Sequence, residues 1–387
     1  MNKNILLIAL VSFFVDFSTA MITPILPIFV IEYLDAGYAE LGIIIAVSTF
    51  VTYATRLFSG YLSDKFALVK PLVVGGYLLS TIAKPLFYFV GSWSGAAVLQ
   101  TLERFGKGVR EAPRDTLISY SSHAGGSGRS FGLHRTLDTA GHFFGSLTLF
   151  LALLYFGQSE ETIRNLFLFS ALPGLIGVMV VIVFVKDIRP KRFEIQKISF
   201  TERDRKLIWP IVIYSGFTAF LFTEPFFVMR AKESGFETLH IPLLFMVFTL
   251  SQALLSYPIG KLIDKYKSNR VLTAAYIIGV TTTLLMLYGS TVSIVLAYIG
   301  FGLYTTASLN AIRALISDIA TNKALTYGFF YTVLALAIFV SSILIGLIWD
   351  SFGADNALLF SLIGTILFLI LTIWKRQITG DATSEGI

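Results

Sequence analysis

The chain has 387 residues, of which 55% are hydrophobic and only 14% charged. That is more apolar side chain than one soluble core of this size needs, so the composition excludes an ordinary soluble protein and indicates a lipid environment. Cysteine is absent, which excludes disulfides, thiolate metal sites and a cysteine nucleophile. The net charge of +6 does not require a nucleic-acid partner, because membrane topology explains where the charges lie.

The apolar runs predict an all-α membrane protein with twelve spans, each near the ~20 residues that cross a hydrocarbon core as helix. In chain order the spans are 5–31, 38–62, 71–91, 94–118, 132–156, 165–185, 207–229, 238–262, 271–289, 292–317, 325–348 and 356–374. The first span has no small-residue cleavage site and continues through Pro24 and Pro27, so we interpret it as a helix rather than a signal peptide.

Lysine and arginine gather in alternate loops. The hydrophilic segment Lys186–Lys206 contains eight of them against four acidic residues, and Lys261–Arg270 contains four. By the positive-inside rule, these segments and both termini lie in the cytoplasm, which requires an even number of spans. We therefore expect a multi-pass protein of the inner membrane.

Repeated segments indicate that a six-helix unit has been duplicated. Gly60-Tyr-Leu-Ser-Asp64-Lys65 recurs at an offset of 200 as Gly260-Lys-Leu-Ile-Asp264-Lys265. We predict an N-terminal bundle over 1–185, a cytoplasmic linker over 186–206, and a C-terminal bundle with a short tail over 207–387. We expect the loop residues of both repeats to act as a conformational latch; these are Gly60, Asp64, Lys65, Lys70, Gly260, Asp264, Lys265 and Arg270.

This repeated loop resembles the signature loop of the major facilitator superfamily, and the resemblance covers essentially the whole chain. It implies two six-helix bundles around a central cavity that opens alternately to each side of the membrane. The stretch Arg104–Ala112 resembles the family's fourth-helix motif, in which an arginine near the cavity is tied to proton coupling. Lys107 and Arg110 depart from that motif, and the stretch Gly141–Gly145 lacks the proline of the family's antiporter motif.

Charged residues of the fourth span share one helical face. At 100° per residue they fall within a sector of about 140°; they are Glu103, Arg104, Lys107, Arg110, Glu111, Arg114 and Asp115. An ionisable group inside a bilayer is costly unless it is paired or faces water, so this face does not point at lipid. We expect the residues from Arg110 to Asp115 to reach the cytoplasmic end. There, Glu111, Arg114 and Asp115 would extend the latch by pairing with Arg56, Asp64, Lys65 or Arg135.

Nearer the midplane, Glu103 and Arg104 either form a mutual ion pair or face the cavity. Lys84 either faces the cavity or extends its ammonium group to the outer boundary. Together with Lys107, His142 and Glu224, Arg104 and Lys84 are the candidates for lining a solute cavity.

Asp16 is the first candidate for the residue that carries a coupling proton. Only neutral residues surround it in the first span, and burial disfavours a charged carboxylate unless a cation is near. The alternative is a permanent ion pair with Arg104 or Lys84. Glu103 and Asp138 are the next candidates. His134 and His142 lie eight residues apart without a neighbouring carboxylate pair, so we interpret them as packed or lining residues and expect no metal site.

Secondary transport of a small solute is the predicted function, coupled to protons and carried out by a monomer without a cofactor. An enzyme would need a nucleophile, metal or phosphate-binding constellation, and the sequence contains none; a membrane sensor would usually carry an appended soluble domain. The cations Lys84, Arg104 and Lys107 favour an anionic or zwitterionic solute. The alternative is efflux of amphiphilic or cationic compounds, anchored by acidic residues of the spans such as Asp16 and Glu224.

Overall fold

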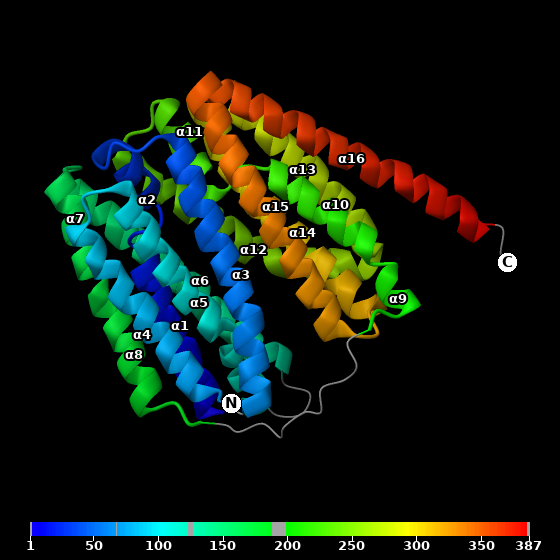
Figure 1. The fold of residues 1–387 in the computed structure, drawn as a ribbon, viewed down its shortest axis with the longest axis horizontal. Helices are drawn as coiled ribbons and strands as arrows, with labels where there is room; N and C mark the ends of the chain where they lie inside the picture. Colours follow the sequence, from blue (N-terminus) through cyan, green and yellow to red (C-terminus); the bar gives the residue numbers. More distant parts are fainter. Residues whose placement is uncertain (1, 67, 123–126, 188–198, 385–387) are drawn as a thin grey trace. The chain divides into compact units, whose positions relative to one another are not determined.

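The computed structural model (Figure 1) describes residues 2–66, 68–122, 127–187 and 199–384. Throughout these residues the regular elements are all helices. The all-α class predicted from the sequence is therefore confirmed.

The chain forms two compact units. Unit 1 comprises Met1–Gln196 together with Phe236–Leu250, and unit 2 comprises Lys197–Gly235 together with Ser251–Ile387. The predicted linker lies partly outside the described residues, at 188–198. The division into bundles over 1–185 and 207–387 stays a prediction.

Unit 1 is built from the helices of the first half of the sequence. In chain order these are α1 (Lys3–Ala20), α2 (Leu26–Ile28), the π-helical turn η1 (Phe29–Tyr33), α3 (Tyr38–Phe66), α4 (Lys70–Leu86), the 3₁₀ turn η2 (Phe87–Phe89), α5 (Trp93–Ser121), α6 (Ser127–Phe156), α7 (Glu160–Phe169) and α8 (Ala171–Val183). The 3₁₀ turn η3 (Thr238–His240) and the first part of α12 (Ile241–Tyr266) also belong to this unit.

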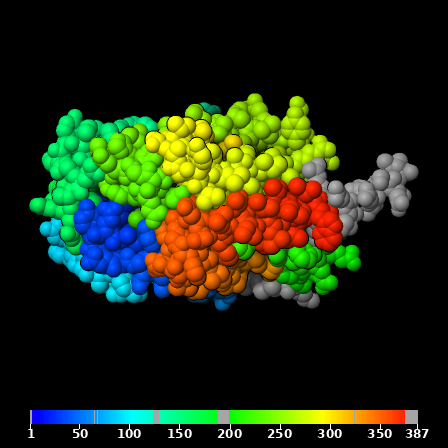
Figure 2. Space-filling model, turned by 90° about the horizontal axis from the view of Figure 1, so that it is seen from above, coloured from blue at the N-terminus to red at the C-terminus, as the bar shows by residue number. Residues whose placement is uncertain are grey.

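Unit 2 contains the remainder of α12 and the other helices of the second half. These are α9 (Glu202–Arg205), α10 (Ile208–Phe220), α11 (Glu224–Glu233), α13 (Ser268–Tyr288), α14 (Thr291–Ile319), α15 (Lys323–Phe352) and α16 (Ala354–Ser384). Figure 2 shows atoms of α15 and α16, in orange to red, on one face of this unit. On α16 the side chains of Ile363, Ile370 and Trp374 are exposed, as expected for a helix that faces lipid.

Eleven helical segments of the described chain are long and apolar enough to cross a membrane. α5 is not among them because of its many charged residues, but its 29 residues extend roughly 43 Å at 1.5 Å per residue, more than the hydrocarbon thickness. With α5 the segments make the twelve predicted spans.

The first and seventh spans are broken, whereas the sequence predicted continuous helices over 5–31 and 207–229. α1 ends at Ala20, and turns lead through Pro24 to α2; α10 ends at Phe220, and α11 starts with Pro225 in its first turn. Proline has no backbone N–H and disfavours helical conformation in the residue before it, so it starts a helix more readily than it continues one. The breaks lie about 200 residues apart, at equivalent places in the two halves.

Two extensive helix pairings of unit 1 have equivalents in unit 2. In unit 1 they are α1 with α6 and α4 with α5, and in unit 2 α10 with α15 and α13 with α14. In each unit the first span thus packs on the fifth, and the third on the fourth. This agreement supports the duplication inferred from the repeated loops.

A polar clamp recurs at the same offset of 200. In unit 1, Asn4 Nδ2 donates to Ser121 Oγ (3.1 Å), where α5 ends. In unit 2, Asp204 Oδ1 accepts from the backbone N–H of Thr321 (2.8 Å), just after α14 ends. Each clamp joins the start of a unit's first span to the end of its fourth.

Candidate functional site

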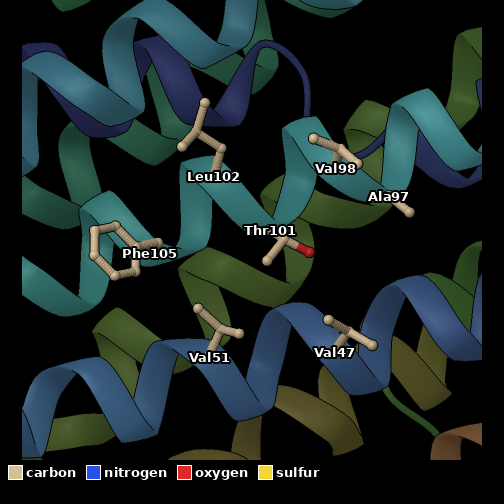
Figure 3. Close-up of a pocket in the computed structure, with 7 residues that line it drawn as sticks. All are labelled: Val47, Val51, Ala97, Val98, Thr101, Leu102 and Phe105. Carbon is tan, nitrogen blue, oxygen red and sulfur yellow. The ribbon is translucent and has the colours of Figure 1, made fainter.

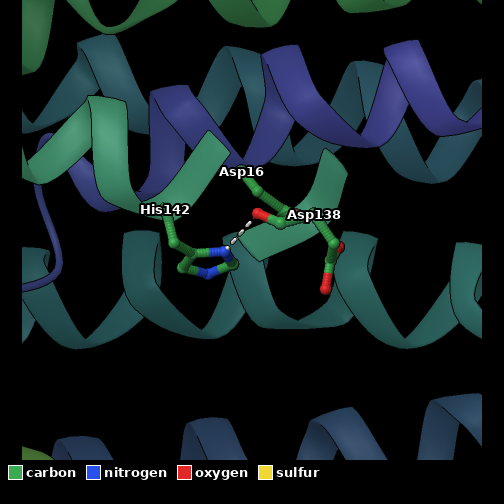
Figure 4. A group of neighbouring side chains, drawn as sticks. All are labelled: Asp16, Asp138 and His142. Carbon is green, nitrogen blue, oxygen red and sulfur yellow. Dashed lines mark hydrogen bonds between the residues drawn. The ribbon is translucent and has the colours of Figure 1, made fainter. Parts of the chain in front are cut away.

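Two carboxylates and an imidazole meet between α1 and α6 of unit 1 (Figure 4). Side-chain oxygen or nitrogen atoms of Asp16, Asp138 and His142 all lie within 4.8 Å of one another. Asp16 is 8% exposed and Asp138 9%. The interpretation that no carboxylate pair lies near the histidines is therefore wrong for His142, because Asp16 approaches it from a different helix.

Helical spacing and small residues produce this arrangement. His134, Asp138 and His142 follow one another at intervals of four residues on α6, and Ser12 and Asp16 do so on α1, so each set lies on one helix face. We call these five residues the α1–α6 seam. Glycines 141 and 145 of α6 allow the close approach, since a Cβ atom at either position would collide with the backbone of α1.

The two carboxylates of the seam differ in their partners. Asp138 Oδ2 lies 3.0 Å from Arg135 Nη1. Asp16 has no ion pair among the described residues. The alternative of a permanent pair between Asp16 and Arg104 or Lys84 is not seen, because those cations have other partners.

His142 is held by its own helix. Its Nδ1 lies 3.0 Å from the carbonyl oxygen of Asp138, to which the neutral ring donates. Nε2 is then left as an acceptor. The site thus offers two carboxylates and one imidazole nitrogen in an almost fully buried place, a set that can hold and exchange a proton.

A small cavity lies at the end of α1. It is lined by Thr19, Ile22, Thr23, Leu26, Lys84, Phe87, Gln100, Glu103 and Arg104. Its volume of about 20 Å³ suffices for about one water molecule, so this conformation is closed around it. The cavity combines a cation-rich wall with the apolar side chains of Ile22, Leu26 and Phe87.

Glu103 and Arg104 form the mutual ion pair that was one of the two alternatives, with Arg104 Nε 3.4 Å from Glu103 Oε2. Both residues also line the small cavity, and their role toward a solute stays a prediction. Glu103 is 4% exposed, and its Oε1 has no hydrogen-bond partner among the described residues. This oxygen is a buried acceptor that a cationic group could use.

Lys84 is 1% exposed and does not extend to the outer boundary. Its Nζ donates to Thr19 Oγ1 (2.8 Å), Ser18 Oγ (3.0 Å) and the Val15 carbonyl oxygen (3.4 Å). The cation therefore joins α4 to the end of α1 beside the cavity.

The charged residues near the inner end of α5 form ion pairs, and some of these pairs are the ones that the latch prediction named. Arg56 of α3 lies 3.0 Å from Glu111 and 3.7 Å from Asp115, and Arg114 lies 3.1 Å from Asp115. Among the described side chains of the candidate partners, Arg56 is the one that forms these pairs. Arg135 is not, because it pairs with Asp138.

The placement of Arg110 corrects the expectation that it reaches the cytoplasmic end. It is 2% exposed, donates from Nη1 to Ser80 Oγ (2.7 Å) and lies over the Tyr77 ring (4.6 Å to the centroid). Tyr77 also lies 3.2 Å from Ser12 Oγ. Tyr77, Ser80 and Ser12 were not among the predicted site residues, because neutral polar residues in an apolar helix give no charge signal.

The repeated loops show fewer contacts. In unit 1, Gly60 packs near Ala112 of α5, Lys65 Nζ donates to Tyr61 (3.0 Å), and Lys70 Nζ donates to the Ile182 carbonyl oxygen (2.8 Å). The Asp64 side chain is outside the described atoms. In unit 2, the side chains of Asp264, Lys265 and Arg270 are exposed, and Gly260 has open space beside its Cα. The latch role of these residues stays a prediction.

Three predicted cavity residues lie apart from the small cavity's lining, and one of them, His142, belongs to the α1–α6 seam. Lys107 is half-buried on α5, and Glu224 is half-buried at the first residue of α11 in unit 2.

A separate apolar hollow lies between α3 and α5 (Figure 3). It is lined by Val47, Val51, Ala97, Val98, Thr101, Leu102 and Phe105 and has a volume of about 640 Å³. Only the Thr101 hydroxyl is polar. Its size is that of a ligand pocket, but nothing in its lining would orient a charged solute.

Comparisons with known proteins agree with this architecture. The family model described as the Major Facilitator Superfamily matches residues 8–340. An uncharacterized MFS-type transporter of Methanocaldococcus jannaschii is 31% identical, with 90% of this chain and 89% of that protein covered.

Solved transporters share the fold at low identity. A crystal structure of the nucleoside transporter NupG has a TM-score of 0.77 at 14% identity, covering 96% of this chain and 98% of that one. A POT family transporter in complex with 5-aminolevulinic acid has a TM-score of 0.80 at 10% identity, covering 98% and 97%. The chain is thus a multi-pass secondary transporter of a small solute, not an enzyme, and it belongs to the major facilitator superfamily.

Proposed function

We propose that the protein is a proton-coupled transporter of a small zwitterionic or anionic solute, working by alternating access in the cytoplasmic membrane. The observation that carries this proposal is the buried carboxylate of Asp16, which faces Asp138 and has no ion pair among the described residues. Two carboxylates this close cannot both ionise cheaply, so sharing one proton is the favourable state. Loss of that proton on one side of the membrane and its uptake on the other would couple the cycle to a pH gradient.

The solute would bind at the small cavity. Arg104 presents a planar guanidinium suited to a carboxylate, and Glu103 Oε1 is a buried acceptor suited to an ammonium group. Ile22, Leu26 and Phe87 supply an apolar wall. A small amino-acid-like molecule has all three complementary parts, and opening of the cavity would be needed to admit it.

Transport by the purified protein in proteoliposomes tests the proton site. A panel of amino acids and 5-aminolevulinic acid would be offered with pH gradients of both directions. Asp16→Asn is expected to abolish accumulation driven by the pH gradient but to preserve solute exchange, because exchange does not require the site to release its proton.

The matched control is Asp318→Asn, which changes an exposed aspartate of α14 and is expected to leave both assays unchanged. Full pH-driven accumulation by the Asp16→Asn protein would contradict the proposal. The coupling proton would then belong to another group, with Glu103 and Asp138 the next to test.

Arg104→Lys tests the solute site separately. Lysine keeps the charge but loses the forked geometry, so the apparent affinity for the carboxylate solute should fall about tenfold, the equivalent of about 1.4 kcal/mol. Unchanged affinity would remove Arg104 from the binding site.

The apolar hollow between α3 and α5 favours a second candidate function, efflux of amphiphilic or cationic compounds. Its volume and lining suit an apolar body next to the charged residues of α5. Transport of a lipophilic cation in the same proteoliposomes, weakened by Phe105→Ala and indifferent to Arg104→Lys, would favour this candidate over the first.

A further inference from the structure

We propose that His134 transfers protons between the Asp16–Asp138 pair and the end of unit 1 at which α1 and α6 begin. The proposal rests on the proposed function, since it concerns the same proton. It adds a route by which a proton reaches a pair of carboxylates that are each less than 10% exposed.

His134 is positioned by hydrogen bonds rather than by apolar packing alone. It is 6% exposed, and its Nε2 lies 2.7 Å from Ser12 Oγ, which in turn lies 3.2 Å from Tyr77 Oη. His134 and Ser12 are each one turn from a carboxylate of the pair, Asp138 on α6 and Asp16 on α1. Side chains at this spacing have Cβ atoms about 5–6 Å apart, so a side-chain rotation or one water spans the distance.

Depth along the bundle places His134 at the level of a partly exposed carboxylate, one turn nearer the end of unit 1 than the pair. α5 ends at Ser121 and α6 starts at Ser127, so both ends lie at the same side of the unit. Counting back from these ends, Asp115 lies about as deep as His134, whereas Asp138 lies one turn deeper. The Asp115 side chain is 37% exposed and therefore reaches solvent.

The charges around His134 are balanced. Arg114 and Asp115 face it from α5, and Asp138 and Arg135 from its own helix. Two cations and two anions leave no net charge beside the ring, so burial disfavours the imidazolium and the ring holds an additional proton only briefly before it releases it. Tyr77 from α4 adds a neutral hydroxyl through Ser12.

The transfer is a simple proton relay. When the shared proton leaves the pair, a nitrogen of the neutral His134 ring accepts it, and the pair is left as two carboxylates. The imidazolium then gives up one proton to solvent near Asp115 and returns to neutral. Loading runs through the same steps in reverse, and no other group is consumed.

The test measures protonation of the pair directly and needs no solute. The full chain in lipid nanodiscs is subjected to a rapid pH jump, and the infrared carbonyl band of protonated carboxyl groups is followed in time. His134→Gln keeps a hydrogen-bonding side chain that cannot relay a proton. We expect the band to change at least about tenfold more slowly, with the same amplitude and midpoint at equilibrium.

His240→Gln is the matched control, because His240 is an exposed histidine of η3 and its loss should leave the rate unchanged. Asp16→Asn separates the two proposals. Persistence of the band in Asp16→Asn would refute Asp16 as the proton site, and so the proposed function. Loss of the band in Asp16→Asn together with a wild-type rate in His134→Gln would overturn the relay alone.

A second variant covers the case in which His134→Gln does not fold. Asp115→Asn changes a partly exposed side chain at the solvent end of the route and should also slow the band. If His134→Gln does not fold and the band of Asp115→Asn changes at the wild-type rate, the proposed route is contradicted.

Discussion

At the scale of single residues, a substitution of Lys84 can separate an effect on solute affinity from an effect on the stability of the fold. Ser18 Oγ and Thr19 Oγ1, which accept from its ammonium group, also donate to the carbonyl oxygens of Ser170 and Val15. Lys84→Met therefore leaves these hydroxyls with partners, and the free energy of unfolding should change by no more than about 1 kcal/mol. The affinity for the solute identified in proteoliposomes should fall about tenfold, because a cation leaves the cavity wall.

Thermal unfolding in detergent and the concentration dependence of transport measure the two effects of Lys84→Met. Lys261→Met, at an exposed lysine of α12, serves as the control. Normal affinity in a folded Lys84→Met protein would show that the ammonium group only joins α4 to α1.

Sequence reasoning finds charged residues of a site more readily than their partners. Asp16, Glu103 and Asp138 stand out because each interrupts an apolar span. That Asp16 meets Asp138 and His142, and not a cation, depends on how α1 crosses α6, which no local pattern encodes. The neutral residues Ser12 and Tyr77 carry no signal in the sequence and become visible only through their contacts.

At the scale of helices, alanine substitutions at two adjacent glycines of α4 are expected to change the stability of the protein in different ways. A Cβ atom at Gly76 would lie 2.6 Å from the Gly106 carbonyl oxygen and 2.8 Å from the Cβ of Arg110, whereas a Cβ at Gly75 would meet nothing within 4 Å. Gly76→Ala should destabilise the protein by about 1–3 kcal/mol through overpacking of α4 against α5. Gly75→Ala should be neutral or slightly stabilising, because alanine is the better helix former.

Thermal unfolding of the two alanine variants in the same detergent checks this pair. Equal unfolding temperatures would show that α4 and α5 do not pack through these glycines. Because the residues are neighbours on one helix, effects of lipid or detergent on α4 are shared and cancel in the comparison.

Helix positions follow from hydropathy to within a few residues, but helix continuity does not. The broken first and seventh spans contain prolines that the sequence analysis placed inside helices, whereas Pro85, Pro113 and Pro258 do lie inside α4, α5 and α12. A proline in a membrane helix is tolerated when neighbours satisfy the freed carbonyl group, so the outcome depends on tertiary packing. α5 shows the converse: its charges weaken the hydropathy signal, although they share one helical face and leave the other faces apolar.

At the scale of the whole molecule, the offset of 200 residues links features of quite different kinds. The repeated loops were visible in the sequence. The broken first spans and the clamps at Asn4 and Asp204 became visible in the structure. The α1–α6 seam, in contrast, has no counterpart of the same composition in the second half of the sequence, so the proton chemistry proposed above would belong to unit 1.

The orientation of the chain in the membrane is the last prediction, and the absence of cysteine makes it directly measurable. A membrane-impermeant maleimide labels only introduced cysteines that face the solution to which it is added. Lys3→Cys, Glu202→Cys and Arg270→Cys replace exposed residues at the N-terminus, in the linker and after the eighth span, and should react only from the cytoplasm. Glu161→Cys, between the fifth and sixth spans, should react only from outside. Outside labelling at Lys3 or Glu202 would contradict an even number of spans with cytoplasmic termini, and with it the assignment of the end at which His134 and Asp115 lie.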